Sequence, residues 1–430
     1  MSEDGKPDLA DELERAESRG RRFGFLRLNF ALLSIAVTVV LDSLAGSIIG
    51  PVMPALLNSL TGGAMAQMST VFGAMMVTIG TMQLFAGPVQ GALSDRYGRR
   101  PIILVSSVGL GLYFVCLALA PNLVWVFAGV VIGGAAAGSV TAAFAYVADI
   151  SGPENRAARF GQLTAAMSAG GASGSLIGGF LGELDPRAPF WVAAALCALN
   201  VLFAVFVLPE SLRPENRAAL AWRSIHPVGA IRSIWRDYPV LKLWQAGTFL
   251  MMFGVTGVNS IFFLYVTFRF GWTSKDIGFY ATFIMLTGLV VQGALVTRTL
   301  ALLGERRTLL GGIVLQIVGT LVCGFATAGW MFTASIFVVM LGTVSGPVRL
   351  AVVNRVVGAS DRGRLSGAER SLFSLTGIAA PAVFAPLYAA VVGAGPEALR
   401  VGTPLFICAA LTVVGLAITV RSLDATPPAG

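Results

Sequence analysis

The sequence contains little charge: only 12% of its 430 residues are Asp, Glu, Lys or Arg, whereas 56% are hydrophobic. Soluble domains usually carry about a quarter charged residues, so the composition excludes an ordinary soluble protein. Apolar stretches of about 20 residues, each long enough to cross a bilayer, recur along nearly the whole chain. The composition therefore predicts a polytopic membrane protein.

Residues that bind metals or catalyse reactions are also scarce. His226 is the only histidine, and the four cysteines stand singly inside apolar runs, where cysteine is ordinarily a small buried side chain. The sequence shows no metal-ligand spacing, nucleophile motif or phosphate-binding loop. We therefore expect no metal, no cofactor and no enzymatic activity. The N-terminal segment has no apolar core typical of a signal peptide, so we expect a cytoplasmic tail, disordered or loosely helical.

Charged residues, prolines and glycines divide the apolar part of the chain into twelve predicted membrane-spanning helices. Their approximate ranges are 30–54, 69–92, 101–120, 122–148, 160–182, 188–208, 242–268, 277–299, 307–326, 330–354, 365–392 and 401–420. Only Pro121 and Asn122 mark the third boundary, and only Ala328 and Gly329 mark the ninth. The predicted fold is all-α.

Lys and Arg are unevenly distributed over the predicted connections. If the N-terminus lies inside, most of them fall in the tails, the central linker and the other inside connections. The opposite side then holds only Arg187, Arg269, Lys275 and Arg400. Because cytoplasmic loops carry the excess of Lys and Arg, both termini are predicted to be cytoplasmic. The same distribution explains the net charge of +8 without a nucleic-acid partner.

The twelve predicted helices form two sets of six. The predicted parts are a tail at 1–29, a six-helix bundle at 30–208, a cytoplasmic linker at 209–241, a second bundle at 242–421 and a tail at 422–430. Within the linker, AIRSIWRDY could form a short amphipathic helix. GALSDRYGRR after the second helix is echoed by GALVTRTLALLGERR after the eighth. This repeat predicts two pseudo-symmetric bundles with a substrate site between them.

One short connection, GALSDRYGRRPIIL, carries the densest charge of the chain. Gly98 permits backbone angles that a sharp turn needs, and Pro101 suits the first turn of a helix. The positive-inside bias explains its arginines, but it does not explain Asp95. A turn that only joined two helices would not need this carboxylate.

These residues resemble the major facilitator superfamily, within it the bacterial drug/proton antiporters, and most closely the tetracycline antiporter branch. The connection matches the loop motif G-x-L-x-D-R-x-G-R-R of the superfamily. LDSLAGSIIGPVMPALL is similar to the first helix of the tetracycline branch, and YVADISGPENRAARFGQLTAAMSAGG is similar to its fourth loop and fifth helix. The resemblance implies twelve helices in two bundles, a small-molecule substrate exchanged against protons, and a monomer in the lipid bilayer of a bacterial inner membrane.

The resemblance also implies roles for particular residues. Asp95 would cap the start of the eleventh helix near Gly363 to Gly367, and Arg99 would pair with Asp149, so that the loop latches the halves together. The implied gating set is Gly91, Asp95, Arg96, Gly98, Arg99, Arg100 and Asp149. The antiporter glycines of the fifth helix correspond to Gly161, Gly170, Gly174, Gly178 and Gly179, with Ser175 in place of the family's proline. Ordinary helix packing explains such glycines equally well.

Ionisable residues inside membrane helices are costly and therefore indicate function. Asp42 lies near the middle of the first helix and is the predicted proton-coupling residue; a static hydrogen-bond network is the alternative. Arg349, Glu369 and Arg370 form a second group, and Arg349 could pair with Glu369 or hold a negative substrate group. The predicted substrate-binding residues are Gln83, Tyr146, Asn259, Gln292, Gln316, Arg349, Glu369 and Arg370.

Several family residues are replaced in this chain. The Arg of the family's fourth helix is Val130, and acidic residues of the tetracycline branch are Tyr113 and Gln316. We therefore expect an exporter of an amphipathic drug, antibiotic or siderophore other than tetracycline, driven by proton antiport. A carrier that is not proton-coupled, or that works in uptake, is the alternative. A membrane scaffold or sensor without transport is the third interpretation.

Overall fold

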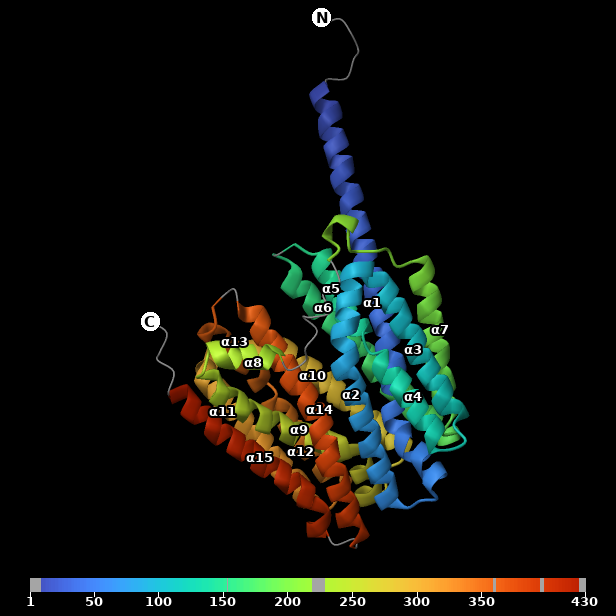
Figure 1. Ribbon diagram of the computed structural model, residues 1–430, viewed down its shortest axis with the longest axis vertical. Coiled ribbons are helices and arrows are strands. Elements are labelled where there is room, and N and C mark those ends of the chain that lie inside the picture. The colour runs from blue at the N-terminus through green and yellow to red at the C-terminus, as the bar shows by residue number, and fades with distance from the viewer. Residues whose placement is uncertain (1–8, 153, 219–228, 359–360, 395–397, 425–430) are drawn as a thin grey trace, which may run out of the picture.

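The computed structural model describes residues 9–152, 154–218, 229–358, 361–394 and 398–424, and these residues form helices and no strand (Figure 1). The first group of helices is α1 (Leu9–Thr61), α2 (Met65–Tyr97), α3 (Arg99–Leu119), α4 (Leu123–Ala135), α5 (Ser139–Asp149), α6 (Arg156–Leu184) and α7 (Ala188–Phe206). The second group is α8 (Gly229–Asp237), α9 (Leu241–Phe270), α10 (Ser274–Val290), α11 (Val296–Phe325), α12 (Gly329–Gly342), α13 (Ser345–Val356), α14 (Arg362–Gly393) and α15 (Ala398–Asp424). A 3-10 turn at Pro214–Asn216 and a π-helical turn at Val291–Leu295 complete the helical elements.

All twelve predicted spans fall on helices, although their limits differ from the predictions. Ten helical stretches in the described part of the chain are long and apolar enough to cross a membrane. One of these, Ser274–Phe325, contains two predicted spans, which are separated by a break at Gly304 with φ 72° and ψ 173°. Helix α6 covers the predicted span 160–182 but is not among the ten, because its many glycines and serines lower its hydropathy. Helix α1 begins at Leu9, so the predicted tail is helical from that residue, and residues 1–8 lie outside the described residues.

Two of the predicted spans are each broken in the middle, which the sequence did not indicate. Span 122–148 divides into α4 and α5 at residues 136–138, and span 330–354 divides into α12 and α13 at residues 343–344. Side chains from neighbouring helices satisfy backbone groups at both breaks. Gln90 of α2 donates to the carbonyl of Ala135, and Gln316 of α11 donates to the carbonyl of Gly342 at 2.9 Å. The breaks lie at corresponding places in the two halves, as a repeated architecture requires.

Helices α1–α7 form one half and α8–α15 form the other, and the halves are joined along two seams (Figure 1). Helix α2 packs along α14, and α6 packs along α10. In the first seam the hydroxyl of Ser69 donates to the carbonyl of Ala385 at 2.8 Å. An added Cβ at Gly73 would lie 2.2 Å from the Cβ of Ala385. In the second seam Thr282 donates to the carbonyl of Ala172 at 2.9 Å.

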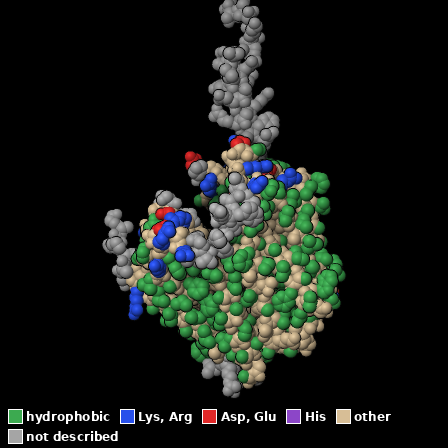
Figure 2. Space-filling view, viewed as in Figure 1, with side chains coloured by type: hydrophobic (Ala, Val, Ile, Leu, Met, Phe, Trp, Pro, Cys, Tyr) green, Lys and Arg blue, Asp and Glu red, His purple; other side chains and the backbone are tan. Residues whose placement is uncertain are grey.

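Basic side chains gather at one end of the molecule. We call this end the basic face; it carries the connection between α2 and α3, and α1 projects beyond it (Figure 1). On the side shown in Figure 2, Lys and Arg cluster at this end, whereas hydrophobic side chains cover the flanks. The two halves diverge toward the basic face and meet at the opposite end (Figure 1). The seam at Ser69 and Ala385 lies near that opposite end, because Ser69 is in the first turns of α2 and the basic face is at its last.

The linker contributes the predicted amphipathic helix, α8, which packs on α9 and α14 of the second half. Its Ile234 is fully buried, and its Trp235 donates the indole N–H to Gln245. At its end Asp237 forms an ion pair with Arg364, with a separation of 2.5 Å. His226 and the rest of the stretch 219–228 lie outside the described residues. The α8 end of the linker is therefore fixed to the second half.

Candidate functional site

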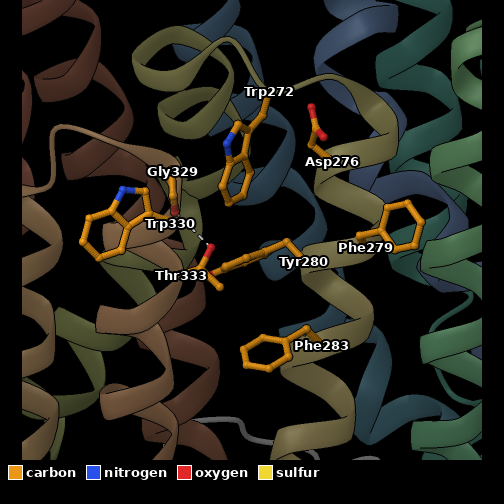
Figure 3. A pocket seen from close by; sticks show the side chains of 8 residues that line it. All are labelled: Trp272, Asp276, Phe279, Tyr280, Phe283, Gly329, Trp330 and Thr333. Carbon is orange, nitrogen blue, oxygen red and sulfur yellow. Dashed lines mark hydrogen bonds between the residues drawn. The ribbon is translucent and has the colours of Figure 1, made fainter.

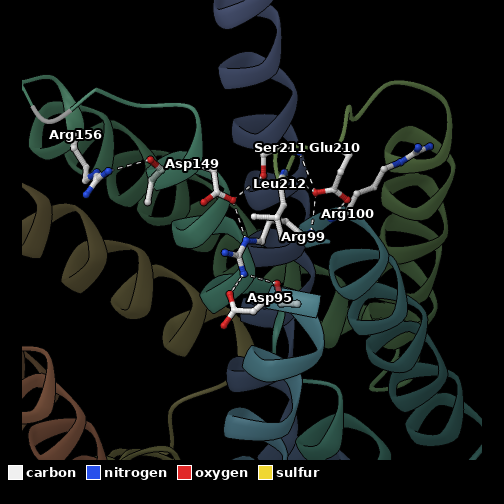
Figure 4. A network of polar contacts seen from close by, with 10 residues as sticks. Asp95, Arg99, Arg100, Asp149, Arg156, Glu210, Ser211 and Leu212 are labelled. Carbon is white, nitrogen blue, oxygen red and sulfur yellow. Dashed lines mark hydrogen bonds and ion pairs between the residues drawn. The ribbon is translucent and has the colours of Figure 1, made fainter. Parts of the chain in front are cut away.

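The loop motif forms a compact polar network at the basic face (Figure 4). Gly98, with φ 113°, turns the chain sharply between α2 and α3, so that Arg99 points back under the turn and is 8% exposed. Its Nε donates to Asp149 at 2.9 Å, and its Nη1 donates to Asp95 at 2.5 Å and to Ser94 at 3.2 Å. The expected pairing of Arg99 with Asp149 is present. One guanidinium thus ties together the ends of α2, α3 and α5.

Glu210, which the sequence analysis missed, completes this network (Figure 4). Its carboxylate accepts hydrogen bonds from the backbone N–H groups of Arg99 and Arg100, at 2.9 and 3.2 Å. A carboxylate at this position satisfies free N–H groups of α3 and complements the positive end of its dipole. An added Cβ at Gly98 would lie 2.3 Å from Glu210 Oε2. The positive φ requires glycine here, and a larger residue would also displace the Glu210 carboxylate.

The residues that follow Glu210 continue the contact between the linker and the motif. Ser211 donates its hydroxyl to Asp149 at 3.1 Å, and the backbone N–H of Ala218 donates to the carbonyl of Asp95 at 3.1 Å. The only sequence signal for this contact was an acidic residue directly after the sixth predicted span. The start of the linker is thus fixed to the first half, as its α8 end is fixed to the second.

The predicted contact of Asp95 with the start of the eleventh helix is not formed in this structure. Among the described side chains, the Asp95 carboxylate pairs only with Arg99 of its own half, and it is 52% exposed. The physical reason is the arrangement of the halves, which diverge at the basic face (Figure 1). A latch between the halves can close only when these ends approach.

Two other predicted gating residues, Arg96 and Arg100, have contacts within the first half. Arg100 donates its Nε to the carbonyl of Ala204 at 3.1 Å and also donates to Val205, so it caps the last turn of α7. The guanidinium of Arg96 lies 5.3 Å from the centre of the Tyr97 ring. An added Cβ at Gly91 would meet nothing within 4 Å. These contacts fix the turn but do not reach the second half.

Asp42 lies in the interior of the first half, where it is 7% exposed. Its Oδ1 accepts a hydrogen bond from Asn200 Nδ2 of α7 at 2.7 Å and one from Ser107 of α3 at 3.1 Å. Asn200 is fully buried and also donates to Ser107 at 3.2 Å. Sequence reasoning missed Asn200, because a single amide in an apolar span belongs to no motif. The carboxylate is therefore held by neutral donors from other helices of the first half.

Three of the predicted glycines of α6 face α1, a fourth faces α10 of the other half, and the fifth lies at an open position. Added Cβ atoms at Gly170, Gly174 and Gly178 would lie 2.1–2.5 Å from backbone carbonyl oxygens of α1, so these three permit the backbones of α1 and α6 to touch. Gly179 faces the other half, where an added Cβ would lie 3.0 Å from the Cα of Gly278 in α10. Gly161 is exposed, and an added Cβ there would meet nothing within 4 Å.

Some of the polar residues predicted to line the cavity are exposed, whereas others are buried or already hydrogen-bonded. Gln83, Asn259 and Gln292 are exposed on α2, α9 and the π-helical turn after α10. Tyr146 is fully buried in the core of the first half. Gln316 is engaged at the break between α12 and α13, where it also donates to Ser345 at 3.1 Å. The first three side chains are therefore exposed, Tyr146 is enclosed by the first half, and Gln316 holds a helix break.

The second intramembrane group contains one loose ion pair. Arg349 Nη1 of α13 lies 3.8 Å from Glu369 Oε2 of α14, and the two side chains are 17% and 14% exposed. Arg349 Nη1 and Glu369 Oε1 are buried and form no hydrogen bond with a described residue. Arg370 is exposed on the adjacent position of α14. The pairing of Arg349 with Glu369 that the sequence suggested is therefore present.

An aromatic pocket of about 360 Å³ lies at the end of the second half opposite the basic face, between α10 and α12 (Figure 3). Its lining consists of Trp272, Asp276, Phe279, Tyr280, Phe283, Gly329, Trp330 and Thr333. Asp276 is engaged in capping α10 through Thr273. The pocket contains none of the predicted site residues. Aromatic side chains at helix ends are typical of the interface between membrane and water.

The apolar helices and their arrangement in two halves are the architecture of a polytopic membrane protein. The chain belongs to the major facilitator superfamily, whose family model matches residues 35–302. It is 30% identical over 366 residues to the tetracycline resistance protein, class C, of Escherichia coli, covering 85% of this chain and 91% of that protein. It is 28% identical over 377 residues to multidrug resistance protein 2 of Bacillus subtilis (strain 168), covering 86% of this chain and 89% of that protein.

A comparison of structures gives the same fold. The human organic anion transporter MFSD10 superposes with a TM-score of 0.67 and 22% identity, covering 91% of this chain and 99% of that one. The predicted family and the predicted all-α polytopic fold class are confirmed by these comparisons. Membership of this superfamily makes the chain a multi-pass membrane protein.

Proposed function

We propose that the protein is a secondary active transporter that exports an amphipathic small molecule in exchange for protons. The observation that carries this proposal is Asp42, a carboxylate deep in a membrane helix whose described partners are neutral. A buried carboxylate of this kind is costly unless it serves function. Relatives named as tetracycline and multidrug resistance proteins support export of a drug-like molecule.

Alternating access between the two halves is the proposed mechanism. The proposed halves are 30–208 and 242–421, joined by the linker 209–241, with both termini and the basic face in the cytoplasm of a bacterium and the protein acting as a monomer. The described conformation would then be open to the cytoplasm, because the halves meet at the end opposite the basic face. Asp42 would take up a proton from one side and release it to the other as its access changes.

The loop motif is proposed to latch the opposite conformation. When the halves close at the basic face, Asp95 would reach the positive end of α14, a contact worth about 0.3–1 kcal/mol. Arg99, Asp149 and Glu210 would keep the motif rigid so that this small free energy biases a balanced equilibrium. The half-exposed carboxylate of Asp95 supports this role, since it is available for a further partner.

The proposed substrate contacts are Gln83, Asn259 and Gln292, because uncharged polar side chains exposed on apolar helices are stable beside a hydrated cavity. Gln292 lies in a π-helical turn, and such turns are frequent at functional sites. Arg349 would favour a substrate with a negative group.

The alternative function is a carrier without proton coupling, or one that works in uptake. The observation that favours it is Val130, which is fully buried in α4 at the position of the family's coupling Arg. A scaffold or sensor has no comparable observation in its favour.

Accumulation assays in an efflux-deficient bacterial host test the export proposal. Cells producing the wild type should accumulate less of at least one compound from a panel of tetracycline, cationic dyes and anionic siderophores. An uncoupler should abolish the difference, and Asp42→Asn should behave like the empty vector. Glu183→Gln, which removes an exposed carboxylate of α6, is the matched control. Equal export by Asp42→Asn would favour the carrier without proton coupling.

A further inference from the structure

The buried site around Asp42 contains more oxygen atoms than its hydrogen bonds use. The Asp42 carboxylate, the Ser107 hydroxyl and the Asn200 side chain are in mutual contact. The hydroxyl of Ser139, the first residue of α5, also hydrogen-bonds the Asp42 side chain. Thr38 lies one helical turn before Asp42 and is 1% exposed. Four helices of the first half thus bring polar side chains to one point.

No positive side chain neutralises this carboxylate among the described residues. The ion pairs there do not include Asp42, and the described partners of its carboxylate are hydroxyl and amide groups. Buried charges in proteins are paired or coordinate a metal ion. Either a proton or a small cation must therefore compensate Asp42.

Two unpartnered groups favour a cation with several ligands. Asn200 Oδ1 and Thr38 Oγ1 are buried and have no hydrogen-bond partner among the described residues, and their residues are 0% and 1% exposed. A proton on Asp42 would neutralise the carboxylate, but its single O–H could donate to only one of these oxygens and would leave the other without a partner. A hard cation coordinates several oxygens at once. Thr38 shares the face of α1 that carries Asp42, because residues four apart are neighbours on a helix.

The side chain of Asn200 can adapt to such an ion. Its amide oxygen and nitrogen are nearly equal in size, so half a turn of the amide exchanges a donor for an acceptor. Oδ1 would then occupy the place of Nδ2, which lies 2.7 Å from Asp42 Oδ1 and 3.2 Å from Ser107 Oγ, and Nδ2 would move to the buried position that Oδ1 leaves. With Ser107 Oγ 3.1 Å from Asp42, three oxygens would form a small triangle. This spacing suits a small ion, and the single carboxylate matches a single positive charge.

We propose that Asp42, Asn200, Ser107 and Thr38 form a sodium-binding site, in which Na⁺ takes the place of the proton. The binding claim goes beyond the proposed function and stands apart from it; only the use of sodium as a coupling ion rests on that function. Sodium and protons would compete for the same carboxylate. The protein would then exchange its substrate against either ion.

Binding of radioactive Na⁺ to the purified full-length protein in detergent tests this proposal, with choline chloride keeping the ionic strength constant. The wild type and the control Glu183→Gln should bind one Na⁺ per chain. Asp42→Asn and Asn200→Leu should lose saturable binding, and Ser107→Ala should bind at least tenfold more weakly. Size-exclusion chromatography and circular dichroism establish that each variant is folded; Ser107→Ala serves as the test if the others are not. Absence of saturable binding to the wild type, or binding that survives these substitutions, overturns the proposal.

A second measurement separates this inference from the proposed function. Thr38→Val removes an oxygen that has no hydrogen-bond partner among the described residues and keeps the carboxylate with its donors, so its vesicles should still show a substrate-evoked proton leak although sodium binding is weakened. A proton leak in wild-type vesicles together with no sodium binding would refute the sodium site and leave the export proposal intact. Sodium binding without any movement of substrate against protons would support the sodium site and refute the export proposal.

Discussion

The contact between α1 and α6 predicts opposite effects for the same substitution at two positions of one helix. An added Cβ at Gly174 would lie 2.1 Å from the carbonyl oxygen of Leu44, well inside an ordinary contact distance, whereas at Gly161 it would meet nothing within 4 Å. Overpacking of this kind costs about 1–3 kcal/mol. Replacing glycine by alanine in an unobstructed helix instead stabilises by about 0.5–1 kcal/mol. Gly174→Ala should therefore destabilise the protein, and Gly161→Ala should stabilise it slightly.

Thermal unfolding of the purified protein, followed with a thiol-reactive dye, measures both effects. Cys197, Cys323 and Cys408 are buried and free, so unfolding exposes them to the dye. The transition should move to lower temperature in Gly174→Ala and stay at or above the wild-type value in Gly161→Ala. Equal destabilisation by both substitutions would refute the assignment of Gly174 to a close contact between helices.

Polar contacts give three further predictions. Glu210→Gln weakens the cap of α3 and should destabilise the first half by about 0.3–1 kcal/mol, measured by the same unfolding assay; no change would exclude the cap. Glu369→Gln should destabilise by about 3–5 kcal/mol, because it leaves the charge of Arg349 buried alone, whereas replacing Glu369 by Leu and Arg349 by Met together should cost much less. A hydrogen bond from Arg364 lowers the pKa of Asp237 below its ordinary 3.8, so the stabilisation from this pair is full above about pH 3.8 and is lost as the pH falls through the lower folded-state pKa. Hydrogen exchange in α8, corrected for intrinsic rates, should thus be equal at pH 7 and pH 5; faster exchange at pH 5 would contradict this assignment.

Local sequence patterns predicted the helices well, because a membrane-spanning helix must be apolar over its whole length. The two mid-membrane breaks were missed because residues 136–138 and 343–344 lie within stretches of small and apolar residues that fit a continuous helix equally well. Only the approach of side chains from neighbouring helices, Gln90 and Gln316, shows how the broken backbone is satisfied. Hydropathy alone cannot report such long-range contacts.

The candidate site was predictable only where a motif marked it. The loop motif located Arg99 and its partner Asp149, which lie 50 residues apart. Glu210 and Asn200 carry no motif, and they reach the site from positions 111 and 158 residues away from their partners Arg99 and Asp42. The contact expected for Asp95 depends on the conformation of the halves rather than on the sequence. Tyr146 and Asn259 were equivalent in the sequence, and the packing of the helices alone separates the buried residue from the exposed one.

The central claim is that Asp42 couples transport to protons, and lumenal pH in inside-out vesicles tests it most directly. Respiration acidifies the lumen, and a transported compound should then cause a proton leak in wild-type vesicles but not in Asp42→Asn vesicles. The compound is one that the accumulation assay has identified. A leak of equal size in both preparations, or transport of labelled compound by wild-type vesicles with no leak, would contradict the account.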